Sequence, residues 1–426
     1  MMHLIAISVS LLCAFGIYAQ AGVITVTNVN DSGPGSLRQA IFTANDGDTI
    51  DFDPALNGQI ITLTSGELPI SKNITISGPG ANLLTVARAK GAPNFRIFHI
   101  TPSHTVIIQG LTITNGNPPP GFGGGILNDG AALSVINCAI TANSTPFTGG
   151  GIYNYAGTSS ATLHIESSTF TANVAGDYGG AIASDVSGMN NATLTINNST
   201  LSSNTGQFAG GGIFNESGGG SASLTVTNTT FSGNVTQLHG GGIANAQTGV
   251  NPAVVDIGNT IFKSGASGQN IVNQAGSVVS HGYNLSDDDG GGYLIGPGDQ
   301  INTDPMLGPL QDNGGPTFTH ALLPGSPAID TGDPNFTPPP FFDQRGPGFD
   351  RVVNGRMDKG SFELQTVTTP TPTPTVTPTA TATVTATPTA TSTPTATPTS
   401  TPRPSPSPRS SSAPRPRPTP APRRTV

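Results

Sequence analysis

Hydrophobic and polar positions follow a repeat of 30 or 31 residues through the middle of the chain. Each copy opens with two or three glycines and an isoleucine, as in GGGIYN from Gly149 and GGGIFN from Gly210. A short alternating stretch follows, and then a single apolar residue. That residue always precedes the isoleucine of the next copy by 12 positions, as Phe170 precedes Ile182. Fixed internal distances of this kind predict one structural unit stacked on itself.

The pattern inside each unit has a period of two. Leu163-x-Ile165 and Leu194-x-Ile196 alternate with polar residues, which is typical of half-buried strands. Gly, Asn, Ser and Thr separate these stretches and favour turns. A helical repeat is excluded, because charged residues make up only 9% of the chain. The sequence predicts an all-β fold, a single-stranded right-handed parallel β-helix, or solenoid, with about three short strands per coil.

Matched positions in successive copies predict columns of stacked residues. We expect Ile152, Ile182, Ile213 and Ile243 to lie inside the solenoid, one above another. The glycines before them suit a corner with positive φ and closely spaced backbones. Stacked asparagines can hydrogen-bond along the axis and tolerate left-handed turns. Two such ladders are predicted, Asn143–Asn173–Asn204–Asn234 and Asn137–Ser167–Asn198–Asn228–Asn259.

Both ends of the solenoid are expected to be covered, because an open end exposes apolar core and unpaired strand edges. Residues 22–115 are interpreted as an N-terminal cap and the first coils. Within them, GSLRQAIFTAN predicts a helical lid at about 36–45, with Ser36 or Gly35 as its N-cap. Residues 116–285 hold the Gly-rich repeats. Residues 286–365 are expected to form an irregular C-terminal cap that closes the last coil.

The two termini differ in composition from the repeats. Residues 1–21 carry an apolar run followed by Ala19-Gln20-Ala21, which is typical of a secretory signal peptide. This favours a secreted or cell-surface location, with the outer membrane as one candidate surface. No second apolar run has membrane length, so we expect no transmembrane helix in the mature chain. Cys138 is then the only remaining cysteine and is expected to be a small buried hydrophobe.

Residues 366–426 form a Thr/Pro/Ser-rich tail that is predicted to be disordered. The tail holds six of the 16 basic residues and no acidic residue. It could therefore contact the cell envelope, and a soluble stalk is the alternative. The preceding 365 residues hold ten basic and 24 acidic residues, which argues against a nucleic acid as partner.

Several motifs resemble known bacterial surface proteins. The GG[GA]I-x-N and F-x-x-N units, with FTAN at Phe170 and FSGN at Phe231, resemble the repeats of polymorphic outer-membrane proteins. GSLRQAI resembles a surface-protein segment that usually reads CSLREAI. Residues from about 281 to 363 resemble the choice-of-anchor Q domain, through NTDPMLGPLQDNGGPT, LLPGSPAIDTGD, DQRG and DKGSFE. The resemblance implies a secreted or surface-displayed β-helix whose C-terminal anchor differs between relatives.

Evidence for catalysis is weak in the sequence. Glycoside hydrolysis needs two facing carboxylates. The acids of the coils lie at scattered repeat positions, and we expect none to stack on another one coil away. Between Arg96 and Arg345 the only Lys or Arg is Lys263, so a lyase would lack a basic group. We therefore favour a non-catalytic adhesin-like, structural or carbohydrate-binding module. A carbohydrate-active β-helix enzyme, either a polysaccharide lyase or a glycoside hydrolase, is the alternative.

Two groups of residues are candidate sites. Phe122, Phe147, Tyr178 and Phe208 stand just before successive glycine corners. If exposed, they would form an aromatic stripe able to stack sugar rings, and if turned inward they would line the core. The expected partner is an extracellular polysaccharide or the surface of a host or neighbouring cell. Asp287, Asp288 and Asp289 could hold Ca²⁺, with a solvated turn as the alternative, and no other cofactor is expected.

Overall fold

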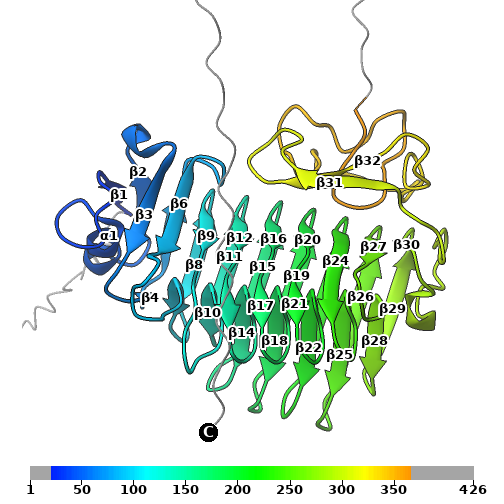
Figure 1. Cartoon of the computed structure of the whole chain (residues 1–426), viewed down its shortest axis with the longest axis horizontal. Helices are drawn as coiled ribbons and strands as arrows, with labels where there is room; N and C mark the ends of the chain where they lie inside the picture. The colour runs from blue at the N-terminus through cyan, green and yellow to red at the C-terminus, as the bar shows by residue number, and fades with distance from the viewer. Residues whose placement is uncertain (1–20, 366–426) are drawn as a thin grey trace, which may run out of the picture. The chain divides into compact units, whose positions relative to one another are not determined.

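The protein is a parallel β-helix of about eight turns in the computed structural model, which describes residues 21–365 (Figure 1). The predicted signal peptide, apart from Ala21, and the predicted Thr/Pro tail lie outside the described residues. The predicted fold class is confirmed: strands of successive coils pair in parallel and form three long sheets.

The three sheets take their strands from every coil in turn. The first sheet consists of β1 (Val23–Val26), β2 (Thr49–Phe52), β5 (Ile74–Ser77), β8 (Thr105–Gln109), β11 (Ala132–Ile136), β15 (Ala161–Glu166), β19 (Ala192–Asn197), β23 (Ala222–Thr227), β26 (Ala253–Gly258) and β29 (Ser277–Gly282). The second sheet consists of β4 (Leu68–Ile70), β7 (Phe98–Ile100), β10 (Ile126–Asp129), β14 (Ile152–Ala156), β18 (Ile182–Val186), β22 (Ile213–Ser217), β25 (Ile243–Gln247) and β28 (Ile271–Gln274).

The third sheet is less regular than the other two. Its main path consists of β3 (Gln59–Leu63), β6 (Leu84–Arg88), β9 (Thr112–Thr114), β12 (Ala139–Thr141), β16 (Thr169–Thr171), β20 (Thr200–Ser202) and β24 (Thr230–Thr236). It is extended by β27 (Ile261–Ser264) and β30 (Leu285–Ser286), and by the two-residue strands β13 (Ser144–Thr145), β17 (Val174–Ala175) and β21 (Thr205–Gly206).

The predicted register is confirmed at the second sheet. Ile152 pairs with Ile182, Ile182 with Ile213 and Ile213 with Ile243, and all four side chains are buried. The core is one continuous column of aliphatic and aromatic side chains, in which Cys138 is also buried. Because each coil covers the apolar residues of the next, the coils stabilise one another rather than folding independently.

The glycine corner has the two properties that the repeat predicted. Gly179 and Gly210 adopt φ of 66° and 65°, a region that side chains disfavour. The next glycine of each motif allows close stacking: a Cβ added to Gly180 would lie 2.4 Å from the carbonyl oxygen of Gly211. Any larger residue there would push two neighbouring coils apart.

The first predicted polar ladder is hydrogen-bonded throughout, the second only in part, and a third ladder was not predicted. In the first ladder, the Asn173 amide donates to Asn204 and the Asn204 amide donates to Asn234, each at 2.9 Å. The five residues of the second ladder all have φ of 49–53°. The unpredicted ladder lies inside the second sheet and uses the asparagine of the glycine motif itself. Its members are Asn128, Asn154, Ser184, Asn215, Asn245 and Asn273.

We predict that Asn204→Ala lowers the free energy of unfolding by about 1–3 kcal/mol, because it removes hydrogen bonds that the Asn204 side chain makes to buried groups. Those groups are the Phe170 carbonyl, the Asn234 side chain and the Asn173 backbone amide. Urea denaturation followed by circular dichroism measures the change. Asn82→Ala, at an exposed position, is the matched control and should change stability by less than about 0.5 kcal/mol. Equal stability of the two variants would show that the ladder does not support the coils.

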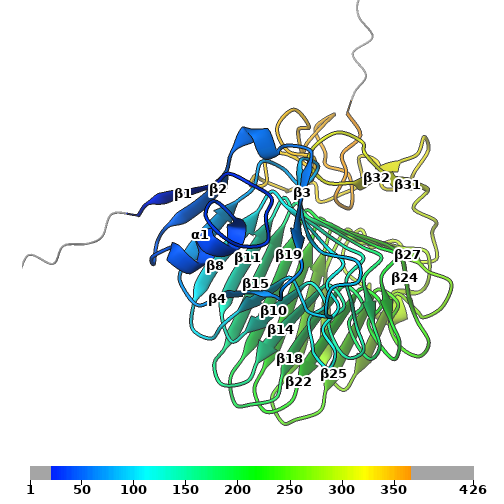
Figure 2. The same ribbon diagram turned by 60° about the vertical axis from the view of Figure 1, so that its left-hand side comes forward.

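The predicted N-terminal lid is confirmed as α1 (Leu37–Thr43), which covers the first coils (Figures 1 and 2). Ser36 is the N-cap, because its hydroxyl accepts a hydrogen bond from the Gln39 amide. Leu37, Ala40 and Ile41 are buried in the core. A short 3₁₀ helix, η1 (Pro54–Leu56), follows in the next coil.

The C-terminal segment closes the last coil with only a few residues. The turn around η2 (Gly290–Gly292) places Leu294 in the core, beside the last coil. Residues 305–364, here called the strap, instead run back along the third-sheet side of the coils (Figure 1). The strap contains one antiparallel pair, β31 (Leu307–Gln311) and β32 (Thr319–Leu322). Most of the segment that was expected to cap the last coil therefore covers the third sheet instead.

A column of threonines on the third sheet anchors the strap. The Thr200 hydroxyl donates to Gln344 at 2.6 Å, and the Thr230 hydroxyl accepts from the backbone amide of Ser361 at 3.0 Å. The Gln344 amide also donates to Thr169, one coil earlier. These polar contacts are buried. The strap thus leaves the second sheet, on another side of the coil, open to solvent.

Candidate functional site

The four predicted aromatic residues lie at the surface, in a row along the solenoid. Phe122, Phe147, Tyr178 and Phe208 retain 36–44% exposure, so the alternative of an inward orientation is wrong. The Phe122 and Phe147 ring centroids are 5.5 Å apart, and those of Tyr178 and Phe208 are 5.9 Å apart. Each residue precedes the glycine corner that leads into the second sheet, so four successive coils each present one aromatic ring.

Further aromatic residues, which the sequence analysis did not single out, lie beside this row on the outer face of the second sheet. Tyr153 stacks on Phe122 with ring centroids 5.1 Å apart, and Phe214 stacks on Tyr178 at 4.6 Å. Tyr155 stacks on Tyr153 at 5.3 Å. Tyr153 and Phe214 are almost fully buried, so they support the exposed rings from below. The sequence did hold a signal for them, because they stand at the outward-facing positions of the strands that follow the glycine motifs.

Two carboxylates stack on adjacent coils in the same region. Asp185 on β18 and Glu216 on β22 are register partners, and Asp129 on β10 pairs with Tyr155 in the same column. The expectation that no acid stacks on another one coil away is therefore wrong. All three acids stand three positions after the isoleucine of their glycine motif. The column thus runs Asp129, Tyr155, Asp185 and Glu216 along the outer face of the second sheet.

Burial changes the ionisation of this acid pair. Burial raises the pKa of Asp185, although the Tyr153 hydroxyl, which donates to its Oδ2 at 2.5 Å, acts in the opposite direction. Burial, and next the charge of Asp185, raises the pKa of Glu216. Neither carboxylate forms an ion pair with any residue that the structure describes. The pair is therefore a partly desolvated acidic spot without a basic neighbour.

Most of these side chains line two adjoining hollows, of about 470 Å³ and 380 Å³, that together are called the aromatic groove. Phe147 belongs to the row of rings but lines neither hollow. Tyr178, Phe214 and Glu216 line both. The larger hollow is also lined by Phe122, Leu127, Asp129, Thr148, Tyr153, Tyr155, Asp185 and Ser187. The smaller is also lined by Phe208, Ala209, Leu238, His239, Ala246, Thr248 and Gln274. Among these described lining residues there is no Lys or Arg.

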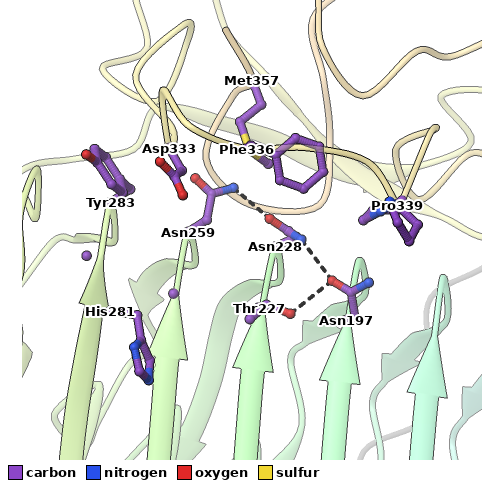
Figure 3. Close-up of a pocket in the computed structure, with 13 residues that line it drawn as sticks. Asn197, Thr227, Asn228, Asn259, His281, Tyr283, Asp333, Phe336, Pro339 and Met357 are labelled. Carbon is purple, nitrogen blue, oxygen red and sulfur yellow. Dashed lines mark hydrogen bonds between the residues drawn. The ribbon is translucent and has the colours of Figure 1, made fainter.

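A third hollow, of about 300 Å³, lies between the second asparagine ladder and the strap (Figure 3). The Asn259 amide donates to Asn228, and the Asn228 amide donates to Asn197, each at 2.9 Å. Phe336 and Met357 of the strap face these amides across the hollow. Because the amides already bond to one another, the hollow serves the attachment of the strap more than the binding of a ligand.

The structure also places the predicted Ca²⁺ residues. The Asp287 Oδ1 accepts from the Ser264 amide at 2.9 Å, and the Asp288 Oδ2 accepts from the Asn270 amide at 2.7 Å. Asp289 accepts from the amide of Gly291 at 2.9 Å. The first two bonds tie the turn to the coil before it, and the third lies within the turn. Ca²⁺ binding by this triplet stays a prediction.

A different acidic group converges inside the strap. One carboxylate oxygen each of Asp330, Asp358 and Glu363 lies within 4.8 Å of the others. Glu363 accepts from the amides of Val353 and Asp358, and Asp358 accepts from those of Asp330 and Leu364. Burial raises the pKa of Glu363 to about 8. The group therefore holds backbone turns of the strap together.

Comparison with known proteins adds no family to this geometry. No family model, no curated protein and no solved structure matches the chain. Within the described residues, no helix is long and apolar enough to cross a membrane. The aromatic groove and the motifs of the sequence are therefore the observations that point to a function.

Proposed function

We propose that this protein is a secreted or cell-surface β-helix that binds a polysaccharide along the aromatic groove without cleaving it. The observation that carries the proposal is the row of half-exposed rings, one per coil, at Phe122, Phe147, Tyr178 and Phe208. Coils repeat about every 4.8 Å, close to the length of one sugar residue in an extended polysaccharide. Successive sugars could therefore meet successive rings.

The motifs support the same location and role. The apolar start with Ala19-Gln20-Ala21 favours export, and the glycine repeats resemble those of polymorphic outer-membrane proteins. The segment from about 281 to 363 resembles the choice-of-anchor Q domain, which favours display at a cell surface. We place the partner among extracellular polysaccharides or the glycans of a host or neighbouring cell.

We predict that Tyr178→Ala weakens polysaccharide binding about 2- to 10-fold, because one stacked ring contributes about 0.5–1.5 kcal/mol. Phe147→Ala should do the same, and both variants should remain folded, although each loses the packing of its ring on a neighbouring ring. Affinity electrophoresis in gels that contain a panel of neutral, amino and acidic polysaccharides measures the change.

Phe341→Ala is the matched control, since Phe341 is 67% exposed on the strap, away from the groove. Its binding should equal that of the parent chain. If Tyr178→Ala and Phe147→Ala also bind like the parent, the ligand does not lie on the aromatic row.

A second candidate function is hydrolysis of the bound polysaccharide, favoured by the Asp185–Glu216 pair. Register partners lie about 4.8 Å apart at Cα, near the separation of about 5–5.5 Å between the carboxyl groups of retaining glycosidases. The roles of acid and nucleophile would need pKa values that differ, whereas burial raises the pKa of both groups.

Incubation of the chain with each polysaccharide that it binds, followed by measurement of new reducing ends, separates the two functions. We expect none. If the parent chain instead releases reducing ends and Glu216→Gln does not, the protein is a glycoside hydrolase.

A further inference from the structure

The charges around the aromatic groove are unbalanced. Asp129, Asp185 and Glu216 line it, and its other polar lining side chains are neutral hydroxyl and amide groups, together with His239. Near the N-terminal end of the groove, His99 Nε2 lies 3.7 Å from Asp129, and Arg96 pairs with Glu67. The centre of the groove, at Asp185 and Glu216, has no such cationic partner among the described residues.

Two stacked and partly buried carboxylates without a counter-charge are costly, since each is desolvated and each repels the other. The Tyr153 hydroxyl bonds to Asp185, yet it is neutral and serves only one of the two. Burial raises the pKa of both carboxyls, in agreement with the lack of a cationic neighbour. A ligand that brings a positive charge would remove this cost on binding, whereas an anionic ligand would increase it.

The rings and the acids lie at suitable places for one kind of sugar. Tyr178 lines the groove together with Asp185 and Glu216 and stacks on Phe214 beside them. A pyranose ring lying on Tyr178 would present its substituents to the acid pair. An ammonium group donates up to three hydrogen bonds, which matches two carboxylates that accept them.

We propose that the aromatic groove selects polysaccharides of amino sugars that carry free, protonated amines, held between the ring of Tyr178 and the carboxylates of Asp185 and Glu216. This inference rests on the proposed polysaccharide binding and specifies its ligand. Polymers of uronic acids are the class that the groove should reject, because their carboxylates would meet Asp185 and Glu216 at short range.

Calorimetric titration of the full chain with three short oligosaccharides tests the proposal: glucosamine oligomers, N-acetylglucosamine oligomers of equal length, and galacturonate oligomers. We expect the free-amine oligomer to bind at least about tenfold more tightly than the acetylated one, as one added charge-assisted hydrogen bond suggests. Higher salt should reduce this advantage. The double variant Asp185→Asn/Glu216→Gln should abolish it, and chelator should have no effect.

Asp256→Asn is the control for non-specific attraction to the acidic body, because Asp256 lies on the first sheet and pairs with His281. It should leave the free-amine preference unchanged. Equal binding of the free-amine and acetylated oligomers would overturn the inference while leaving polysaccharide binding intact. Tighter binding of galacturonate, with or without Ca²⁺, would overturn it as well. Binding of none of the three sugars, with none in the wider panel, would overturn the proposed function itself.

Discussion

Replacing Arg345 with alanine is expected to lower the free energy of unfolding by about 3–5 kcal/mol, because it leaves Asp343 buried without its partner. The Arg345 Nη2 lies 2.6 Å from Asp343 Oδ2, and both side chains are almost fully buried. The guanidinium is also held between two rings, with its carbon 3.9 Å from the centroids of Phe349 and Phe362. Removal of this one side chain therefore weakens several parts of the strap together.

Urea unfolding of the full chain measures the effect. Arg356→Ala is the control on the same strap, where the guanidinium bonds to the Gly332 carbonyl and forms no ion pair with any described residue. We expect it to cost about 1 kcal/mol. Equal losses for the two variants would show that the Asp343–Arg345 pair does not hold the strap on the coils.

Truncation of Phe231 to alanine is expected to cost about 3–5 kcal/mol through loss of burial and the cavity that remains. Phe231 is buried in the third sheet and stacks on Phe262 of the next coil, with ring centroids 4.9 Å apart. Loss of the Phe231 ring removes contacts between two coils, so unfolding should also become less cooperative.

Thermal and urea unfolding of Phe231→Ala measure this change. Phe42→Ala is the matched control, because Phe42 is 77% exposed on α1, and we expect it to change stability by less than about 0.5 kcal/mol. A loss below about 1 kcal/mol in Phe231→Ala would mean that neighbouring coils pack less tightly than the register implies.

The register of the coils could be predicted because the repeat keeps its internal distances. From Ile152 to Ile182 and onward, the same number of residues separates each isoleucine from the apolar residue before it. In a parallel solenoid this fixes which residues stack. The same counting placed the asparagine ladder of Asn173 and Asn204 correctly.

The stacking of Asp185 on Glu216 was missed although the sequence held its signal. Both acids stand three residues after the isoleucine of a glycine motif, and register follows from that offset. The inner asparagine ladder was missed for a similar reason, since Asn215 and Asn245 are part of the motif that defined the repeat.

The direction of the aromatic side chains and the position of the strap had no local signal in the sequence. The row from Phe122 to Phe208 precedes a glycine with positive φ, and the offset from the next isoleucine alternates between four and five residues. Side-chain direction there depends on the path of the corner, which periodicity does not fix. The position of the strap depends on contacts such as Thr200 with Gln344, which are 144 residues apart in the chain.

The most direct test of polysaccharide binding in the aromatic groove is a crystal structure of the chain with its tightest-binding oligosaccharide. We expect sugar rings along the axis on Phe147, Tyr178 and Phe208, beside the carboxylates of Asp185 and Glu216. Sugar bound instead in the hollow beneath the strap, against Asn228 and Phe336, would contradict this expectation.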